Sequence, residues 1–230
     1  MNNSEFEKWV DYIVEKTAMP KAFFENGIND WKARILLGRA LSRKNINKLD
    51  PAMDLYYSIV DIEVTEPEDI ENKAWALWEL GLCIWHIEED ANKAIKYIDM
   101  SIQVAEYIPD KFPFVERGEL WYDRWWLLNH IDQADKAMLE VNQKISERDV
   151  RFKNNSYLYY SYRFKADLSY KIGDIDQALA FLYQALAYFP EGDNTIANLQ
   201  QLWENRNNDK EKTYKEMDEL IQHPHVCWEI

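Results

Sequence analysis

Residues 159–190 constrain the fold of this chain more than any other segment. They form two helix-length runs, rich in apolar residues and joined by a short turn that contains Gly173 and Asp174. Glycine tolerates a positive φ, and an aspartate that follows it can cap the next helix. Small residues at Ala178 and Ala185 then allow the second helix to cross the first closely. The segment therefore predicts a tight pair of antiparallel helices.

Less regular versions of the same pattern occur at 30–64, 74–108 and 115–148. The positions that match across the four segments are Arg34, Leu37, Gly38, Leu41, Ala52, Tyr56, Ile59, Leu77, Leu80, Gly81, Ile84, Ala94, Ile98, Ser101, Ala134, Met138, Val141, Tyr162, Ala166, Ala178, Leu182, Ala185 and Pro190. Two positions depart from the pattern. Tyr122 stands where a small residue is expected, which predicts a wider crossing of its helix pair, and Lys165 replaces a leucine.

This pattern resembles the tetratricopeptide repeat (TPR), a helix–turn–helix unit of about 34 residues. The resemblance implies an all-α fold: a right-handed superhelical α-α solenoid of about four helix pairs, with extra helices at both ends. We expect one domain over 1–230, because such units bury their apolar faces only by stacking on one another. The shortage of glycine and proline, six and seven residues, agrees with a fold that needs few turns.

The two ends are expected to carry additional helices. In segment 1–29, Ser4 and Glu7 fit a capping box for a helix that runs to about Ala18, and Gly27 breaks a short second helix. In segment 194–230, helices at about 194–205 and 209–222 are expected to cap the stack before a tail.

The charge of the chain restricts its partners. The net charge is −14, so a nucleic-acid backbone would be repelled and a basic protein or peptide attracted. Most of the surplus lies in 54–123, which holds 17 acidic and 5 basic residues. Acids at 63–71 and 88–90 form either a solvated surface or an electrostatic lure for a basic partner.

The sequence also bears on location. No apolar run approaches the roughly 18 residues typical of a membrane span, and the polar, acidic start does not look like a signal peptide. Cys83 and Cys227 do not suggest a disulfide framework. We therefore expect a cytoplasmic protein without a membrane partner.

The resemblance also implies which residues face the groove of the solenoid, from the first helix of each pair. For the first pair they are Lys32, Ile35, Arg39, Ser42 and Arg43. The candidate partner-binding residues from the other three pairs are Trp75, Trp78, Leu82, Trp85, His86, Glu116, Glu119, Asp123, Trp126, Tyr160, Arg163, Asp167 and Tyr170, with Leu127 and Lys171 at the same register.

The three tryptophans of the second pair share one helical face, opposite the apolar residues expected to pack between repeats. A helix that is apolar all round is either buried or presents a binding surface. If Trp75, Trp78 and Trp85 line the groove, Trp78→Ala or Trp85→Ala should abolish partner binding with little loss of helicity. If they form core, the same changes should unfold the helix.

Motifs of catalysis are missing from the sequence. No phosphate-binding glycine loop, Gly-x-Ser-x-Gly or His-Glu-x-x-His occurs. His223, His225 and Cys227 match no strong zinc pattern. We therefore expect no catalytic residues, no cofactor and no metal.

The function expected from these features is non-catalytic protein binding. Its most concrete form is an acidic inhibitor or immunity-type protein that neutralises a basic partner such as a toxin. The alternative is a secretion-type TPR chaperone or adaptor that holds an extended client peptide.

Overall fold

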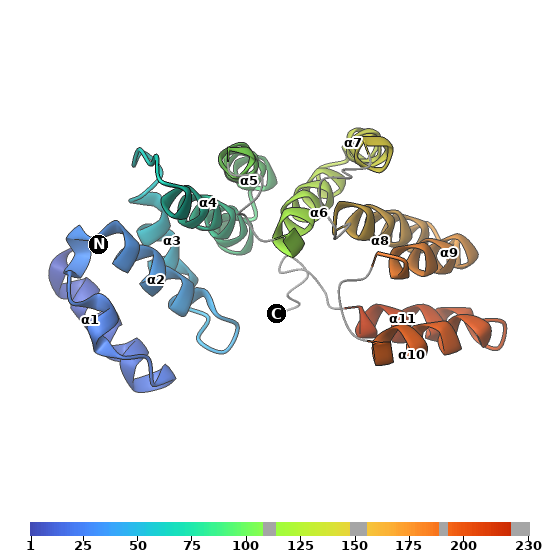
Figure 1. Cartoon of the computed structure of the whole chain (residues 1–230), viewed down its shortest axis with the longest axis horizontal. Coiled ribbons are helices and arrows are strands. Elements are labelled where there is room, and N and C mark those ends of the chain that lie inside the picture. Colours follow the sequence, from blue (N-terminus) through green and yellow to red (C-terminus); the bar gives the residue numbers. More distant parts are fainter. Residues whose placement is uncertain (108–113, 148–155, 189–192, 222–230) are drawn as a thin grey trace. The chain divides into compact units, whose positions relative to one another are not determined.

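The computed structural model describes residues 1–107, 114–147, 156–188 and 193–221, without the side chains at 114–117, 147, 193 and 194 (Figure 1). Every regular element in these ranges is a helix, and no strand occurs in them. The expected all-α fold class is confirmed for the described chain. The chain divides into two compact units, Met1–Lys111 and Phe112–Ile230, called unit 1 and unit 2 below.

The described part of unit 1, residues 1–107, contains five α-helices and two short 3-10 helices. They are α1 (Asn3–Thr17), η1 (Lys21–Phe24), η2 (Gly27–Asn29), α2 (Trp31–Ser42), α3 (Leu49–Tyr57), α4 (Pro67–Glu88) and α5 (Ala91–Glu106). Helix α1 packs on α2, α2 on α3, α3 on α4 and α4 on α5, and α2 also contacts α4. The first helices of the two expected pairs therefore lie against each other in this unit.

The first helix begins two residues earlier than expected. Asn2 caps α1, because its side chain accepts a hydrogen bond from the Glu5 backbone N–H at 3.0 Å. The Glu5 carboxylate accepts the Asn2 N–H in return at 2.9 Å. The expected capping box at Ser4 and Glu7 is therefore wrong, since Ser4 already lies within the helix. The end of α1 agrees with the expectation: Ala18 adopts a left-handed φ of 55° just after Thr17.

Unit 2 contains six described helices. They are α6 (Phe114–His130), α7 (Ala134–Glu147), α8 (Ser156–Lys171), α9 (Ile175–Leu186), α10 (Asp193–Glu204) and α11 (Lys210–Leu220). Helix α8 contacts α6, α7 and α9, while α10 and α11 pack on α9 and on each other. The two C-terminal helices agree with the expected ranges to within about two residues.

The turn between α8 and α9 is confirmed. Gly173 has a φ of 81°, and the Asp174 carboxylate accepts the Gln177 N–H at 3.0 Å. Ala178, Leu182 and Ala185 are fully buried, as their spacing predicts. Pro190, which ends the pattern, lies outside the described residues.

Glycines mark the closest helix crossings. A Cβ atom at Gly38 would lie 2.7 Å from the Tyr56 ring, and one at Gly81 would lie 2.8 Å from Ile98. These contacts join α2 to α3 and α4 to α5, two of the crossings that the sequence pattern predicts to be close. A third glycine lies on α6. A Cβ atom at Gly118 would lie 2.7 Å from the backbone oxygen of Ser156, so this glycine allows α6 to lie against α8.

Candidate functional site

The tryptophans of α4 differ in their exposure. Trp78 is fully buried, with 0% of its surface exposed, whereas Trp75 and Trp85 are half-buried. The rings of Trp75 and Trp78 lie 4.9 Å apart between centroids. Leu82 is buried as well. Solvent therefore reaches Trp75 and Trp85 but not Trp78.

His86, the next expected groove residue, is half-buried near the end of α4. Burial lowers the pKa of its imidazole, which favours the neutral form at physiological pH. A neutral ring can both donate and accept a hydrogen bond, so His86 adds a polar group to this surface without adding charge.

Arg39 of α2 lies beside the tryptophans of α4. Its guanidinium carbon stands 4.8 Å from the centre of the Trp75 ring, a cation–π arrangement that orients an otherwise exposed arginine. The sequence predicted Arg39 and Trp75 for the groove wall of successive helix pairs, and the structure brings them together. Of the other first-pair candidates, Ile35 and Ser42 are buried, and Lys32 pairs with Asp69 at 2.6 Å.

Glu79 belongs to the same region, although it is not among the residues expected from the sequence. Ser42 Oγ lies 3.4 Å from a Glu79 carboxylate oxygen and 3.3 Å from the Tyr56 hydroxyl. Burial raises the pKa of Glu79, and Arg39 and Ser42 oppose this shift. The signal that could have identified it is simple, because Glu79 is the one acid in the otherwise apolar run 74–87.

Exposed carboxylates lie at both ends of α4. Asp61, Glu63, Glu66 and Glu68 precede or begin the helix, and all four are exposed. The C-terminal end is acidic as well, although an acid is unfavourable there because of the helix dipole. We call these exposed acids, together with those of the α4–α5 turn, the acidic ends of α4.

The turn between α4 and α5 uses its acids partly for structure. Glu88 pairs with Lys93 at 2.6 Å, and Asp90 caps α5 by accepting the Lys93 N–H at 2.9 Å. Glu89 is exposed and holds a left-handed φ of 52°, a conformation that glycine or asparagine adopts more readily. Local structure therefore accounts for Glu88 and Asp90 but not for the choice of an acid at 89.

The acidic candidates of α6 are largely inside unit 2. Asp123 is fully buried and Glu119 is half-buried. Trp126 is half-buried and stacks on His130, with 5.4 Å between ring centroids. Leu127 is buried. The side chain of Glu116 lies outside the described residues.

The candidates on α8 are covered by α11. Tyr214 of α11 stacks on Tyr170, with centroids 3.9 Å apart and planes within 4° of parallel. Its hydroxyl donates a hydrogen bond to Asp167 at 2.7 Å, and Tyr122 of α6 donates another to the same carboxylate. Three helices therefore converge on Asp167.

Arg163 is the most buried charge of this cluster, with 1% of its surface exposed. It donates to Asp218 of α11 and lies 3.5 Å from Asp167. Burial alone would lower the pKa of Arg163, but Asp167 and Asp218 together raise it well above its ordinary value, so the guanidinium stays charged. Tyr160 is buried as well, and Lys171 at the end of α8 is exposed.

Helix α11 therefore uses the candidate residues of α8 for packing inside unit 2. The sequence predicts helix α11 near the end of the chain but gives no sign that Tyr214 and Asp218 contact α8. These contacts join residues 47 and 55 positions apart, which no local pattern reveals.

Across the described ranges, no group of three or more His, Cys, Asp or Glu side chains is arranged to hold a metal ion. His223, His225 and Cys227 lie outside those ranges. No described helix combines the length and the apolar character needed to cross a membrane.

Comparisons of the chain with protein-family models, with curated proteins and with solved structures found no match.

Proposed function

We propose that this chain is a non-catalytic, cytoplasmic protein-binding protein whose helix pairs form a right-handed TPR-like solenoid. Its most concrete role is that of an acidic inhibitor or immunity-type protein that neutralises a basic protein such as a toxin. The observation that carries the proposal is the surface of α4, where the half-buried Trp75 and Trp85 lie between the two acidic ends of the helix.

The TPR-like part of the proposal is supported by the order of helix packing. Within unit 1, α3 follows α2 and packs on α4, and within unit 2, α7 follows α6 and packs on α8. The second helix of one pair therefore contacts the first helix of the next. Gly38 and Gly81 stand at the crossings inside two pairs, where the repeat pattern requires small residues.

The inhibitory part rests on electrostatics and on the aromatic surface. Exposed carboxylates carry negative charge, which accelerates the approach of a positively charged protein. Tryptophan is enriched among the residues that dominate interface energies, because it buries a large area on binding. Arg39 on the Trp75 ring adds a fixed donor for a carboxylate or a backbone carbonyl of the partner.

The test uses a basic toxin-like protein encoded beside the gene for this chain. Co-expression should rescue growth, and the purified proteins should associate more slowly as ionic strength rises. Trp75→Ala should weaken binding by at least about ten-fold if the ring is an interface anchor. Tyr183→Ala removes a more exposed aromatic ring from α9 and serves as the matched control.

Trp78→Ala is not a useful binding variant, since the burial of Trp78 predicts that it destabilises unit 1 by about 3 kcal/mol or more. If Trp75→Ala binds as tightly as Tyr183→Ala while both remain folded, the α4 surface is not the site. If the association rate does not change with salt, the acidic ends do not steer the partner.

The alternative function is a secretion-type chaperone or adaptor for an extended client peptide. The half-exposed aromatic rings of α4 favour it, because they could hold apolar side chains without any charge complementarity. A client of this kind should bind with nearly the same rate at low and high salt. The ionic-strength series therefore separates the two roles.

A further inference from the structure

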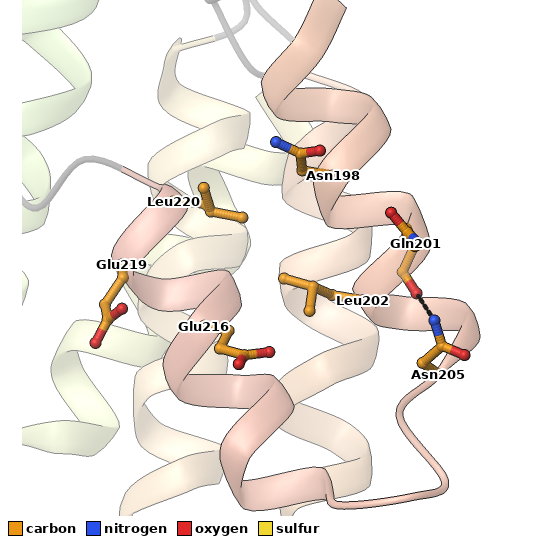
Figure 2. Close-up of a pocket in the computed structure, with 7 residues that line it drawn as sticks. All are labelled: Asn198, Gln201, Leu202, Asn205, Glu216, Glu219 and Leu220. Atoms are coloured by element: carbon orange, nitrogen blue, oxygen red, sulfur yellow. Dashed lines mark hydrogen bonds between the residues drawn. The ribbon is translucent and has the colours of Figure 1, made fainter.

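The last two described helices of unit 2 line an open pocket that the proposed function does not use. Its volume is about 620 Å³, within the range typical of ligand sites. Three lining residues come from α10, one from the turn that follows it and three from α11: Asn198, Gln201, Leu202, Asn205, Glu216, Glu219 and Leu220. Figure 2 shows Leu202, Glu216 and Leu220 between the two helices.

One side of the pocket is a row of carboxamides that runs along α10 into the turn after it. Asn198, Gln201 and Asn205 are spaced three and four residues apart, so they follow one helical face. Asn205 donates to the backbone oxygen of Gln201 at 2.9 Å, which fixes its orientation. The exposed amides of Asn198 and Gln201 make no side-chain hydrogen bond within the described chain and can still donate and accept.

A carboxamide offers one acceptor and two donors, the same groups that pair with a peptide bond. A row of them can therefore bind the N–H and C=O groups of an extended chain, whose backbone is not already hydrogen-bonded. A helix would not suit the row equally well, because its backbone groups are bonded internally. The amide row thus favours an extended segment.

The other side of the pocket is acidic. Glu219 is exposed, and Glu216 is half-buried with Lys212 3.6 Å away as its ion-pair partner. Leu202 and Leu220 between the rows are half-buried and can accept an apolar side chain. An occupant with alternating apolar and basic residues can contact both the leucines and the glutamates, because side chains alternate across an extended strand.

We propose that the pocket between α10 and α11 binds an extended protein segment in which apolar residues alternate with lysine or arginine. The amides of Asn198 and Gln201 bind its backbone, Leu202 and Leu220 contact its apolar side chains, and Glu216 and Glu219 pair with its cations. This site is separate from the α4 surface and does not depend on the inhibitory role.

The experiment measures fluorescence anisotropy of a labelled ten-residue peptide of alternating leucine and lysine, titrated with the full chain. Asn198→Ala and Gln201→Ala should each weaken binding about five-fold, as expected for the loss of a hydrogen bond. Gln200→Ala is the matched control, because Gln200 is an exposed amide of α10 that does not line the pocket. Circular dichroism checks that every variant stays helical.

Two further peptides separate the parts of the proposal. Glutamate in place of lysine should weaken binding about ten-fold or more, and N-methylation of alternate backbone amides should do so without any change of charge. Equal binding of either peptide, or variants that match Gln200→Ala, would overturn the proposal. So would a dimer in sedimentation velocity that Gln201→Ala dissociates, because the pocket would then be an interface between copies of this chain.

Discussion

At Gly118 the backbone of α6 comes too close to α8 for any side chain. A Cβ atom there would lie 2.4 Å from the Tyr160 ring and 2.7 Å from the Ser156 backbone oxygen. The ring can rotate away, but the backbone oxygen moves only if the two helices separate. The identity of one residue therefore sets the distance between α6 and α8.

Gly118→Ala should destabilise the protein by about 1–3 kcal/mol through this overpacking, although alanine has the higher helix propensity. Chemical denaturation followed by circular dichroism measures the effect. The control is Asn142→Ala on the exposed face of α7, which should stay within about 0.5 kcal/mol of the parent. Equal stability of Gly118→Ala and the parent would show that α6 and α8 can separate freely.

Glu79 makes stability depend on pH. Because burial raises the pKa of its carboxyl in the folded state, the folded protein binds this proton more tightly than the unfolded chain does. The stabilisation that comes from this proton is therefore complete below the ordinary pKa of glutamate. It is lost as the pH rises through the pKa of Glu79 in the folded state. Glu79→Gln removes the titration without changing the shape of the side chain.

We expect Glu79→Gln to gain stability relative to the parent between pH 4.5 and pH 7.5. Urea denaturation of both proteins at the two pH values measures this difference. A relative loss of stability at pH 7.5 would mean that the attraction between the Glu79 carboxylate and Arg39 outweighs burial.

Among single residues, prediction from the sequence reaches its limit where a helix is apolar on every side. The spacing of Trp75, Trp78 and Trp85 places them on one face of α4 but gives no sign that Trp78 is buried more deeply than its neighbours. The exposure of each ring depends on residues that pack against it from other helices, and a helical period does not reveal these.

Among the elements, α11 depends on a charged contact for its position. Asp218 is its link to the buried Arg163, and Tyr214 adds a ring stack and a hydrogen bond on the same face of α8. Removing Asp218 leaves the buried positive charge of Arg163 with fewer negative partners, which is unfavourable.

Asp218→Ala should therefore destabilise the protein by about 3 kcal/mol. Glu219→Ala alters the neighbouring exposed carboxylate and should change stability by less than about 0.5 kcal/mol. Adding Arg163→Met to Asp218→Ala should restore part of the loss, because the buried charge is then gone. Denaturant midpoints of the three variants measure these differences, and no recovery in the double variant would argue against this account.

Helix ends were predictable where glycine, proline or a capping residue marks them. Gly173 and Asp174 give the turn before α9 correctly, and Pro67 at the start of α4 is a signal that could have placed this end. The expected helix pair begins at 74, seven residues later, because the repeat pattern was followed there in place of the proline. At α1 the expected cap was wrong, because Asn2 and Glu5 form the capping box in place of Ser4 and Glu7.

On the scale of the whole molecule, each unit has a hydrophobic core of its own. Phe6, Leu37 and Leu80 are fully buried in unit 1, and Trp125 and Leu182 are fully buried in unit 2. A hydrophobic core of its own is what allows a domain to fold without the rest of the chain.

Residues 1–111, produced alone, should keep their helices and unfold cooperatively. Circular dichroism and thermal denaturation of this fragment measure both properties. Segment 1–60, which lacks α4 and α5, is the control and should be largely unfolded, because much of the buried surface of unit 1 is missing. A fragment 1–111 that unfolds without a cooperative transition would contradict the prediction.

The all-helical class was predictable from composition and helical periodicity together. The division into two compact units was not, because the repeat pattern continues on both sides of residue 111. Repeat patterns describe contacts between neighbouring helix pairs, so they reveal little about where a set of pairs closes into a compact unit.

Cys83 lies inside the α4 core, with 2% of its surface exposed, and burial raises the pKa of its thiol. The thiolate is the nucleophile that attacks an alkylating reagent, so the reagent should modify Cys83 only when unit 1 opens. With Cys227 replaced by serine, the rate of alkylation measures how often unit 1 opens. Any molecule that binds folded unit 1 lowers this alkylation rate in proportion to its occupancy. Unknown partners can therefore be screened without an assay of what they do.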